Sequence, residues 1–151
     1  METTDLGQTE TVTLRVPSRT HYLSLVGACA VEICRRLEYL PNLEQATYDV
    51  QLAVNEAVVN AIEHAYAGSP GGLIEILFHL HPDRLAVDVV DWGQDFDFGA
   101  VPEPTLTQAL ENGYGIMLMH KLMDTVTYES DAVQGNRLRM VKEVGRLGND
   151  D

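Results

Sequence analysis

A long amphipathic helix constrains the fold of this chain more than any other segment. Apolar residues recur at the three- and four-residue spacing of one helical face, at Leu43, Ala46, Val50, Ala53, Val54, Ala57, Val58, Ala61 and Ile62. We expect this helix to begin after Pro41 and Asn42 and to end near residues 67–72, a dense cluster of helix-breaking residues.

Three polar residues of this helix, Glu56, Asn60 and His64, are spaced four apart and therefore share one stripe of its surface. A carboxylate and a carboxamide stacked beside an apolar seam can serve a metal ion and a proton transfer together. The same pattern also fits a solvated stripe on a surface helix, so the helix alone does not decide between a site and an ordinary surface.

The remaining segments predict an antiparallel sheet and a second helix. Ser18 is expected to cap a helix that runs to about Tyr39. Clean alternation of apolar and polar residues indicates a sheet with one face toward water, and it places His79 and His81 on that face as ordinary surface histidines. The expected strands are residues 11–16, 74–80, 85–89, 125–130 and 137–144, with turns at 81–83 and at Gly135 and Asn136.

Composition limits the classes of function. The chain of 151 residues is expected to form one domain over residues 11–144, with disordered tails at 1–10 and 145–151. Its net charge of −13 argues against direct nucleic-acid binding, and any anionic ligand needs a cation and backbone N–H groups. Cys29 and Cys34 are interpreted as buried, reduced thiols of a cytoplasmic protein, and no apolar run is long enough to cross a membrane.

Two further motifs follow the long helix in the chain. The strand that ends at Asp91-Trp92-Gly93 indicates a sharp turn at the mouth of a site. A calcium loop there lacks the EF-hand spacing, and a metal-dependent hydrolase built on Asp91, Asp95 and Asp97 is disfavoured because alternate residues of an extended segment diverge.

The loop 99–112 is expected to be a mobile lid, and Gly113-Tyr114-Gly115 then opens a helix from Ile116 to Met123. Glycines at a helix start let backbone N–H groups approach a phosphate closely.

The ordered set of Glu-x-x-x-Asn-x-x-x-His on a helix, Asp-x-Gly at a strand end and Gly-x-Gly at a later helix start resembles the ATP-binding fold shared by DNA gyrase, histidine kinases and MutL. Within it, the chain is most similar to anti-sigma-factor serine/threonine protein kinases. The resemblance implies an α+β fold, a two-layer α/β sandwich of the Bergerat type. Its sheet would be mixed and mostly antiparallel, with the helices on one face.

The resemblance also implies roles for matching residues. Glu56 would be the general base, or would orient the hydroxyl, for a protein serine or threonine, and Asn60 would hold the Mg²⁺ that bridges the phosphates of ATP or ADP. Asp91 would accept a hydrogen bond from the adenine amino group, and Gly93 would let the backbone come close. The other implied nucleotide-binding residues are His64, Gly113, Tyr114, Gly115, Ile116 and Asn136.

The implied function is an ATP-dependent kinase that phosphorylates a STAS-domain anti-sigma-factor antagonist, and that also sequesters a sigma factor and forms a homodimer. Four positions depart from the family pattern: Asp95 replaces a second glycine, Asn136 a threonine, Glu111 an arginine and Leu25 another arginine. These departures leave open a second reading, a non-catalytic module of the same fold that senses the nucleotide and regulates a partner by contact.

Overall fold

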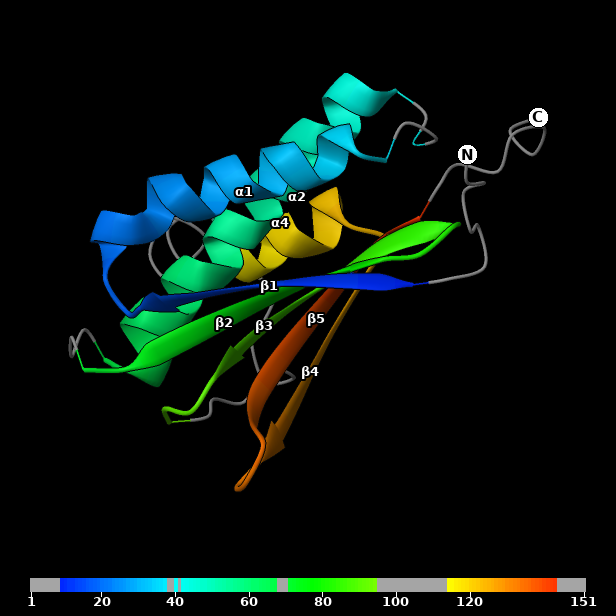
Figure 1. Ribbon diagram of the computed structural model, residues 1–151. Coiled ribbons are helices and arrows are strands. Elements are labelled where there is room, and N and C mark those ends of the chain that lie inside the picture. The colour runs from blue at the N-terminus through cyan, green and yellow to red at the C-terminus, as the bar shows by residue number, and fades with distance from the viewer. Residues whose placement is uncertain (1–8, 38–39, 41, 68–70, 95–113, 144–151) are drawn as a thin grey trace.

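The computed structural model describes residues 9–37, 40, 42–67, 71–94 and 114–143, which form one sheet and one layer of helices. Figure 1 shows the long helices together on one face of the sheet. The helices are α1 (Leu23–Arg35), α2 (Leu43–Asn60) and α4 (Tyr114–Leu122), with the short turns η1 (Thr20–Tyr22) and η2 (Ala61–Ala65). The strands are β1 (Glu10–Pro17), β2 (Leu73–Leu80), β3 (Arg84–Asp91), β4 (Thr125–Asp131) and β5 (Gly135–Glu143).

The strands lie in the order β1-β2-β3-β5-β4, and each neighbouring pair is antiparallel. The predicted two-layer α+β class is therefore confirmed, although the described strands include no parallel pair of the kind that a mixed sheet would have. The strand β1 begins at Glu10, which had been assigned to the N-terminal tail. Two strand edges, one on β1 and one on β4, bound the described sheet.

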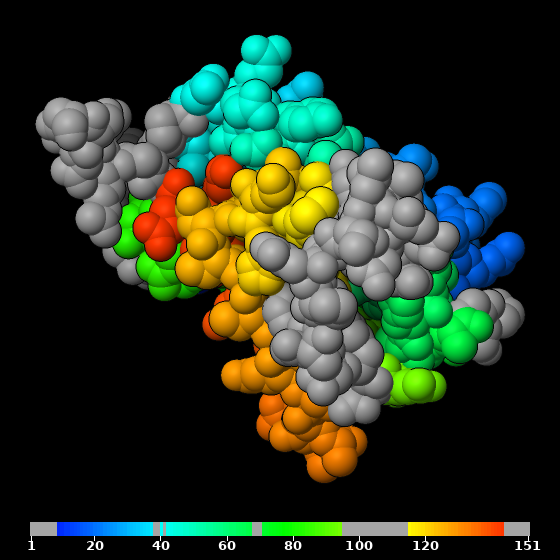
Figure 2. All heavy atoms as spheres, turned by 180° about the vertical axis from the view of Figure 1, so that it is seen from behind, coloured from blue at the N-terminus to red at the C-terminus, as the bar shows by residue number. Residues whose placement is uncertain are grey.

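The core lies between the sheet and the helices. Ile74, Ile76 and Phe78 alternate along β2 and are fully buried, and they belong to the same apolar cluster as Val50 and Val54 of α2. The apolar face of the long helix and the apolar face of the strand therefore belong to one core. In the space-filling view, α4 lies between the start of α2 and the β4–β5 hairpin (Figure 2).

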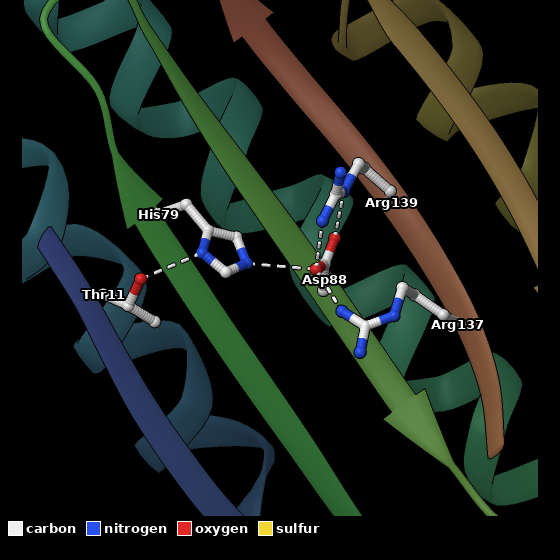
Figure 3. A network of polar contacts seen from close by, with 5 residues as sticks. All are labelled: Thr11, His79, Asp88, Arg137 and Arg139. Atoms are coloured by element: carbon white, nitrogen blue, oxygen red, sulfur yellow. Dashed lines mark hydrogen bonds and ion pairs between the residues drawn. The ribbon is translucent and has the colours of Figure 1, made fainter. Parts of the chain in front are cut away.

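The opposite face of the sheet is covered by its own charged side chains. Asp88 of β3 is 0% exposed on this face, and Arg137 and Arg139 of β5 both bind its carboxylate (Figure 3). His79 is half-buried, not an ordinary surface histidine, because its Nε2 lies 3.0 Å from Asp88 Oδ2 and its Nδ1 lies 3.0 Å from Thr11 Oγ1. The pKa of Asp88 is lowered, because these partners outweigh the effect of burial.

Two predicted boundaries were wrong for local reasons. Ser18 does not cap a helix: its backbone N–H donates to the carbonyl of Gly72 at 2.9 Å, which prolongs the contact between β1 and β2, and α1 begins only at Leu23. The last turn lies at residues 132–134, because the Asp131 carboxylate accepts N–H groups from that segment at 2.7 and 3.0 Å. Gly135 and Asn136 consequently open β5.

The two cysteines form no disulfide. Burial raises the pKa of Cys34 to about 11, so its thiol stays protonated at neutral pH, and burial also raises the pKa of the half-buried Cys29. Within the described part of the chain, no helix combines the length and the apolar character that a membrane span requires.

Candidate functional site

A pocket lies between the C-terminal end of α2 and the neighbouring ends of the central strands. It holds about 270 Å³ of empty space, part of which is open to solvent. Two of the predicted polar residues share it: Asn60 comes from the last turn of α2, and Asp91 from the last position of β3. The remaining lining residues are apolar or aromatic: Ala57, Ala61, Ala65, Val89, Tyr128 and Leu138.

The floor of the pocket depends on a π-turn that continues α2. The backbone N–H of Tyr66 donates to the carbonyl of Ala61 at 3.1 Å, five residues earlier. His64 belongs to this turn. His64 is exposed and is not among the residues that line the pocket.

The end of this turn is bonded to the end of β3. The N–H of Gln94 donates to the carbonyl of Ala65 at 2.7 Å, and the N–H of Trp92 donates to the hydroxyl of Tyr66 at 2.9 Å. A Cβ atom at Gly93 would lie only 2.2 Å from the carbonyl oxygen of Ala65. Gly93 is therefore required for close approach to the protein's own backbone, which is a different reason from the expected approach to a ligand.

Asp91 is held by two donors on the same oxygen. Its Oδ1 accepts the N–H of Gly93 at 3.0 Å and Nδ2 of Asn136 at 2.7 Å. The side chain is 7% exposed, and burial raises the pKa of this carboxyl, while the two hydrogen bonds act in the opposite direction. Among the described residues, no hydrogen bond to Oδ2 is found, so this oxygen is available to a ligand in the pocket.

Glu56 lies against the start of α4. A Cβ atom at Gly115 would be 2.9 Å from Glu56 Oε1, so the carboxylate occupies the space that any side chain at position 115 would need. Burial raises the pKa of Glu56, and the nearby Glu63 raises it further. The structure thus brings together the carboxylate of one predicted motif and the glycine of another.

The other predicted positions have different outcomes. Ile116 is 7% exposed and belongs to the hydrophobic core, and it does not line the pocket. Gly113, the side chain of Tyr114, Asp95, Glu111 and the lid segment 99–112 lie outside the described residues. Asp97 does as well, and the described residues contain no group of three acidic, histidine or cysteine side chains that could bind a metal.

Sequence reasoning missed Tyr128 and Ser130. Both belong to β4, where they alternate on the side that faces the pocket, and Ser130 bonds to Asn136 at 2.7 Å. Because β4 was predicted as a strand, its alternation could have identified both residues once one of them was known to face the site.

Comparisons with known proteins give the family. The family model of the histidine kinase-like ATPase domain matches residues 16–142, which include the pocket residues, the helix α2 that carries Glu56, and nearly all of the β4–β5 hairpin. The chain belongs to the histidine kinase-like ATPase family. The resemblance inferred from the three ordered motifs is thus confirmed.

Within the histidine kinase-like ATPase family, the chain is similar to proteins named serine-protein kinase RsbW. The protein from Halalkalibacterium halodurans is 33% identical, over 92% of this chain and 86% of that protein. The protein from Bacillus pumilus is 32% identical over 96% and 90%, and that from Bacillus subtilis is 32% identical over 79% and 78%.

Residues of the site fit the nucleotide that the histidine kinase-like ATPase family binds. Asp91 presents an oxygen without a described partner in a largely apolar pocket, as an amino-bearing purine requires. Asn60 offers a single oxygen ligand, which suits Mg²⁺ because this ion takes most of its ligands from phosphates and water.

Proposed function

We propose that this chain is an ATP-dependent serine/threonine protein kinase of the anti-sigma-factor type. It binds Mg²⁺ with ATP or ADP and phosphorylates a serine or threonine of a STAS-domain antagonist. The observation that carries the proposal is the position of Glu56. Glu56 shares α2 with Asn60, and its carboxylate lies against Gly115 at the start of α4.

Glu56 is suited to act on an incoming hydroxyl group. Burial and the nearby Glu63 raise the pKa of Glu56, which makes it a better proton acceptor than an ordinary surface glutamate. It precedes Asn60 by one helical turn, so the group that accepts a proton and the group that holds the metal are fixed on one rigid element. ATP binding alone would not require a carboxylate at this position.

The binding groups are separate from Glu56. Asp91 would accept the adenine amino group, Asn60 would supply a ligand to Mg²⁺, and the backbone at Gly113 and Gly115 would flank the phosphates. ATP supplies the transferable phosphoryl group, and Mg²⁺ offsets its charge in a protein of net charge −13. In this arrangement, the protein mainly positions the reactants.

The proposed partners are a STAS-domain antagonist, a sigma factor and a second copy of the chain, all in the cytoplasm. Leu25 of α1 is 49% exposed, and Val12 of the edge strand β1 is 41% exposed. An exposed strand edge with apolar neighbours supports self-association. Light scattering at high concentration with nucleotide is expected to give a dimer mass, and a monomer mass would contradict this proposal.

Incubation with γ-labelled ATP, Mg²⁺ and candidate antagonists encoded nearby tests the kinase. Wild type is expected to label a serine or threonine, and Glu56→Gln is expected to be slower by roughly 10²–10⁴ with ATP affinity within a few fold. Asn60→Ala and Asp91→Asn are expected to weaken ATP binding instead, in the second case by roughly 1.5–3 kcal/mol. Calorimetry that finds wild-type affinity in both would contradict the site.

The second candidate is a non-catalytic module that senses the nucleotide. It is favoured if neither wild type nor Glu56→Gln labels any candidate and both still bind one in an ATP-dependent way. Equal labelling by the two proteins would instead show that phosphotransfer occurs without Glu56 as the base.

A further inference from the structure

A relay of hydrogen bonds runs behind the pocket from β4 to the end of β3. The hydroxyl of Ser130 lies 2.7 Å from Asn136 Oδ1, and Asn136 Nδ2 lies 2.7 Å from Asp91 Oδ1 and 3.0 Å from the carbonyl of Gly93. Asn136 is 4% exposed and Asp91 is 7% exposed. Ser130 is exposed and does not itself line the pocket, so it touches the site only through Asn136.

The direction of each hydrogen bond in this relay follows from the chemistry of the groups. The carbonyl of Gly93 and the carboxylate of Asp91 can only accept, so the amide group that faces them must be the NH₂ of Asn136. The amide oxygen of Asn136 then points at Ser130, which must donate its hydroxyl proton. The two acceptors therefore fix which way the Asn136 amide faces, and the Ser130 hydroxyl anchors the oxygen end of that amide.

The orientation of the amide determines what Asp91 presents to the pocket. With two donors on Oδ1, the carboxylate is held and Oδ2 remains as an acceptor. A flipped amide would set the Asn136 oxygen against two acceptors, Asp91 Oδ1 and the Gly93 carbonyl, so that orientation is disfavoured. Loss of the Ser130 hydroxyl would instead leave the amide oxygen without its anchor, and the amide could swing away from Asp91, which would lose one of its two donors.

We propose that Ser130 is a positioning residue for purine recognition: by anchoring Asn136, it holds Asp91 Oδ2 as the acceptor that selects a 6-aminopurine over a 6-oxopurine. An exocyclic amino group donates to a fixed acceptor, whereas a keto oxygen in the same place repels it. This inference rests on the proposed nucleotide site at Asp91 and adds the residue that sets its selectivity.

Calorimetry with ADP and with inosine diphosphate, both in Mg²⁺, tests the relay. The two nucleotides share ribose and phosphates, so the ratio of their dissociation constants isolates the purine edge. Ser130→Ala is expected to weaken ADP binding roughly two- to tenfold, the effect of one ordinary hydrogen bond, and to leave inosine diphosphate within about twofold. Ser130→Thr keeps the hydroxyl and is expected to retain the wild-type ratio.

Thr127→Ala is the matched control, because Thr127 is an exposed hydroxyl residue on the opposite face of β4. It is expected to leave both affinities and the ratio unchanged. NMR provides an independent measurement. In the wild type, the side-chain amide protons of Asn136 are expected to exchange slowly with water, and in Ser130→Ala the same Asn136 protons are expected to exchange faster.

An unchanged ratio in Ser130→Ala overturns the inference, and so does an equal loss for both nucleotides, which would mean that Ser130 only supports the fold. Fast exchange of the Asn136 amide in wild type also overturns it. Wild type that binds no ADP would overturn the nucleotide site itself, a result distinguishable from failure of the relay, in which ADP still binds with its normal preference.

Discussion

Replacement of Gly115 by alanine tests whether Glu56 acts at the start of α4. The added Cβ atom would lie 2.9 Å from Glu56 Oε1, whereas ordinary contact begins at 3.4 Å. The carboxylate must therefore move by about half an ångström, which is feasible because it is the end of a flexible side chain. Since a displacement of 1 Å at a reacting group can lower a rate by about 10², we expect Gly115→Ala to lower phosphotransfer roughly tenfold.

The same substitution should spare folding and nucleotide binding. Alanine in a helix is more favourable than glycine by roughly 0.5–1 kcal/mol, so the melting temperature should be unchanged or slightly higher. The new methyl group points at Glu56 and leaves the backbone N–H in place, so ATP affinity should stay within a few fold.

Initial rates toward the labelled antagonist, calorimetry with ATP and thermal melts measure the three effects. Gly71→Ala is the matched control, because no atom lies within 4 Å of its added Cβ. A wild-type rate in Gly115→Ala would refute the placement of Glu56 at the reaction, and a parallel loss of ATP affinity would refute the separation of binding from catalysis.

Three further predictions concern the scaffold and the pocket. Gly93→Ala places a Cβ atom 2.2 Å from the Ala65 carbonyl, so we expect a lower melting temperature together with loss of ATP binding, and normal values of both would contradict the close contact. Asp88→Asn leaves two arginines without their carboxylate; denaturant unfolding should show a loss of about 3 kcal/mol with ATP affinity retained. Since the pKa of Asp88 is lowered by folding, its contribution should be fully present above an ordinary pKa of 3.8 and be lost only as the pH falls below that value. Because the pKa of Asp91 is raised, calorimetry should show ATP affinity falling on the acid side at a pH above 3.8, and this fall should be absent in Asp91→Asn.

Local patterns were sufficient for most of the fold. The period of the long helix and the alternation of the β2–β3 hairpin each predicted an element and the face that it buries. The same reasoning failed for Asp88, which reads as one polar residue in an apolar strand. Its burial depends on partners 9, 49 and 51 residues away, and no local pattern contains that information.

The candidate site likewise contains some residues that the sequence identified and one local structure that it did not. Glu56, Asn60 and Asp91 were identified because three ordered motifs carry them, and the structure places Asn60 and Asp91 in one pocket. His64 stays a predicted nucleotide-binding residue, and it does not line the pocket. Residues 61–65 continue the apolar period of the helix, so the sequence there does not distinguish an α-turn from the observed π-turn. The wider turn is specified by hydrogen bonds to the end of β3, which belongs to a different part of the chain.

Because residues 61–65 form a π-turn, the number of residues in this segment matters for the site. The turn holds one residue more than an α-turn between the Ala61 carbonyl and the Tyr66 N–H, so a deletion of one residue there would let the same two groups bond as regular α-helix. An insertion would instead need a still wider turn and would displace the Ala65 carbonyl from Gln94, although each side chain of the pocket could be retained. Natural variants of this domain should therefore tolerate the loss of one residue within 61–65 more readily than the gain of one.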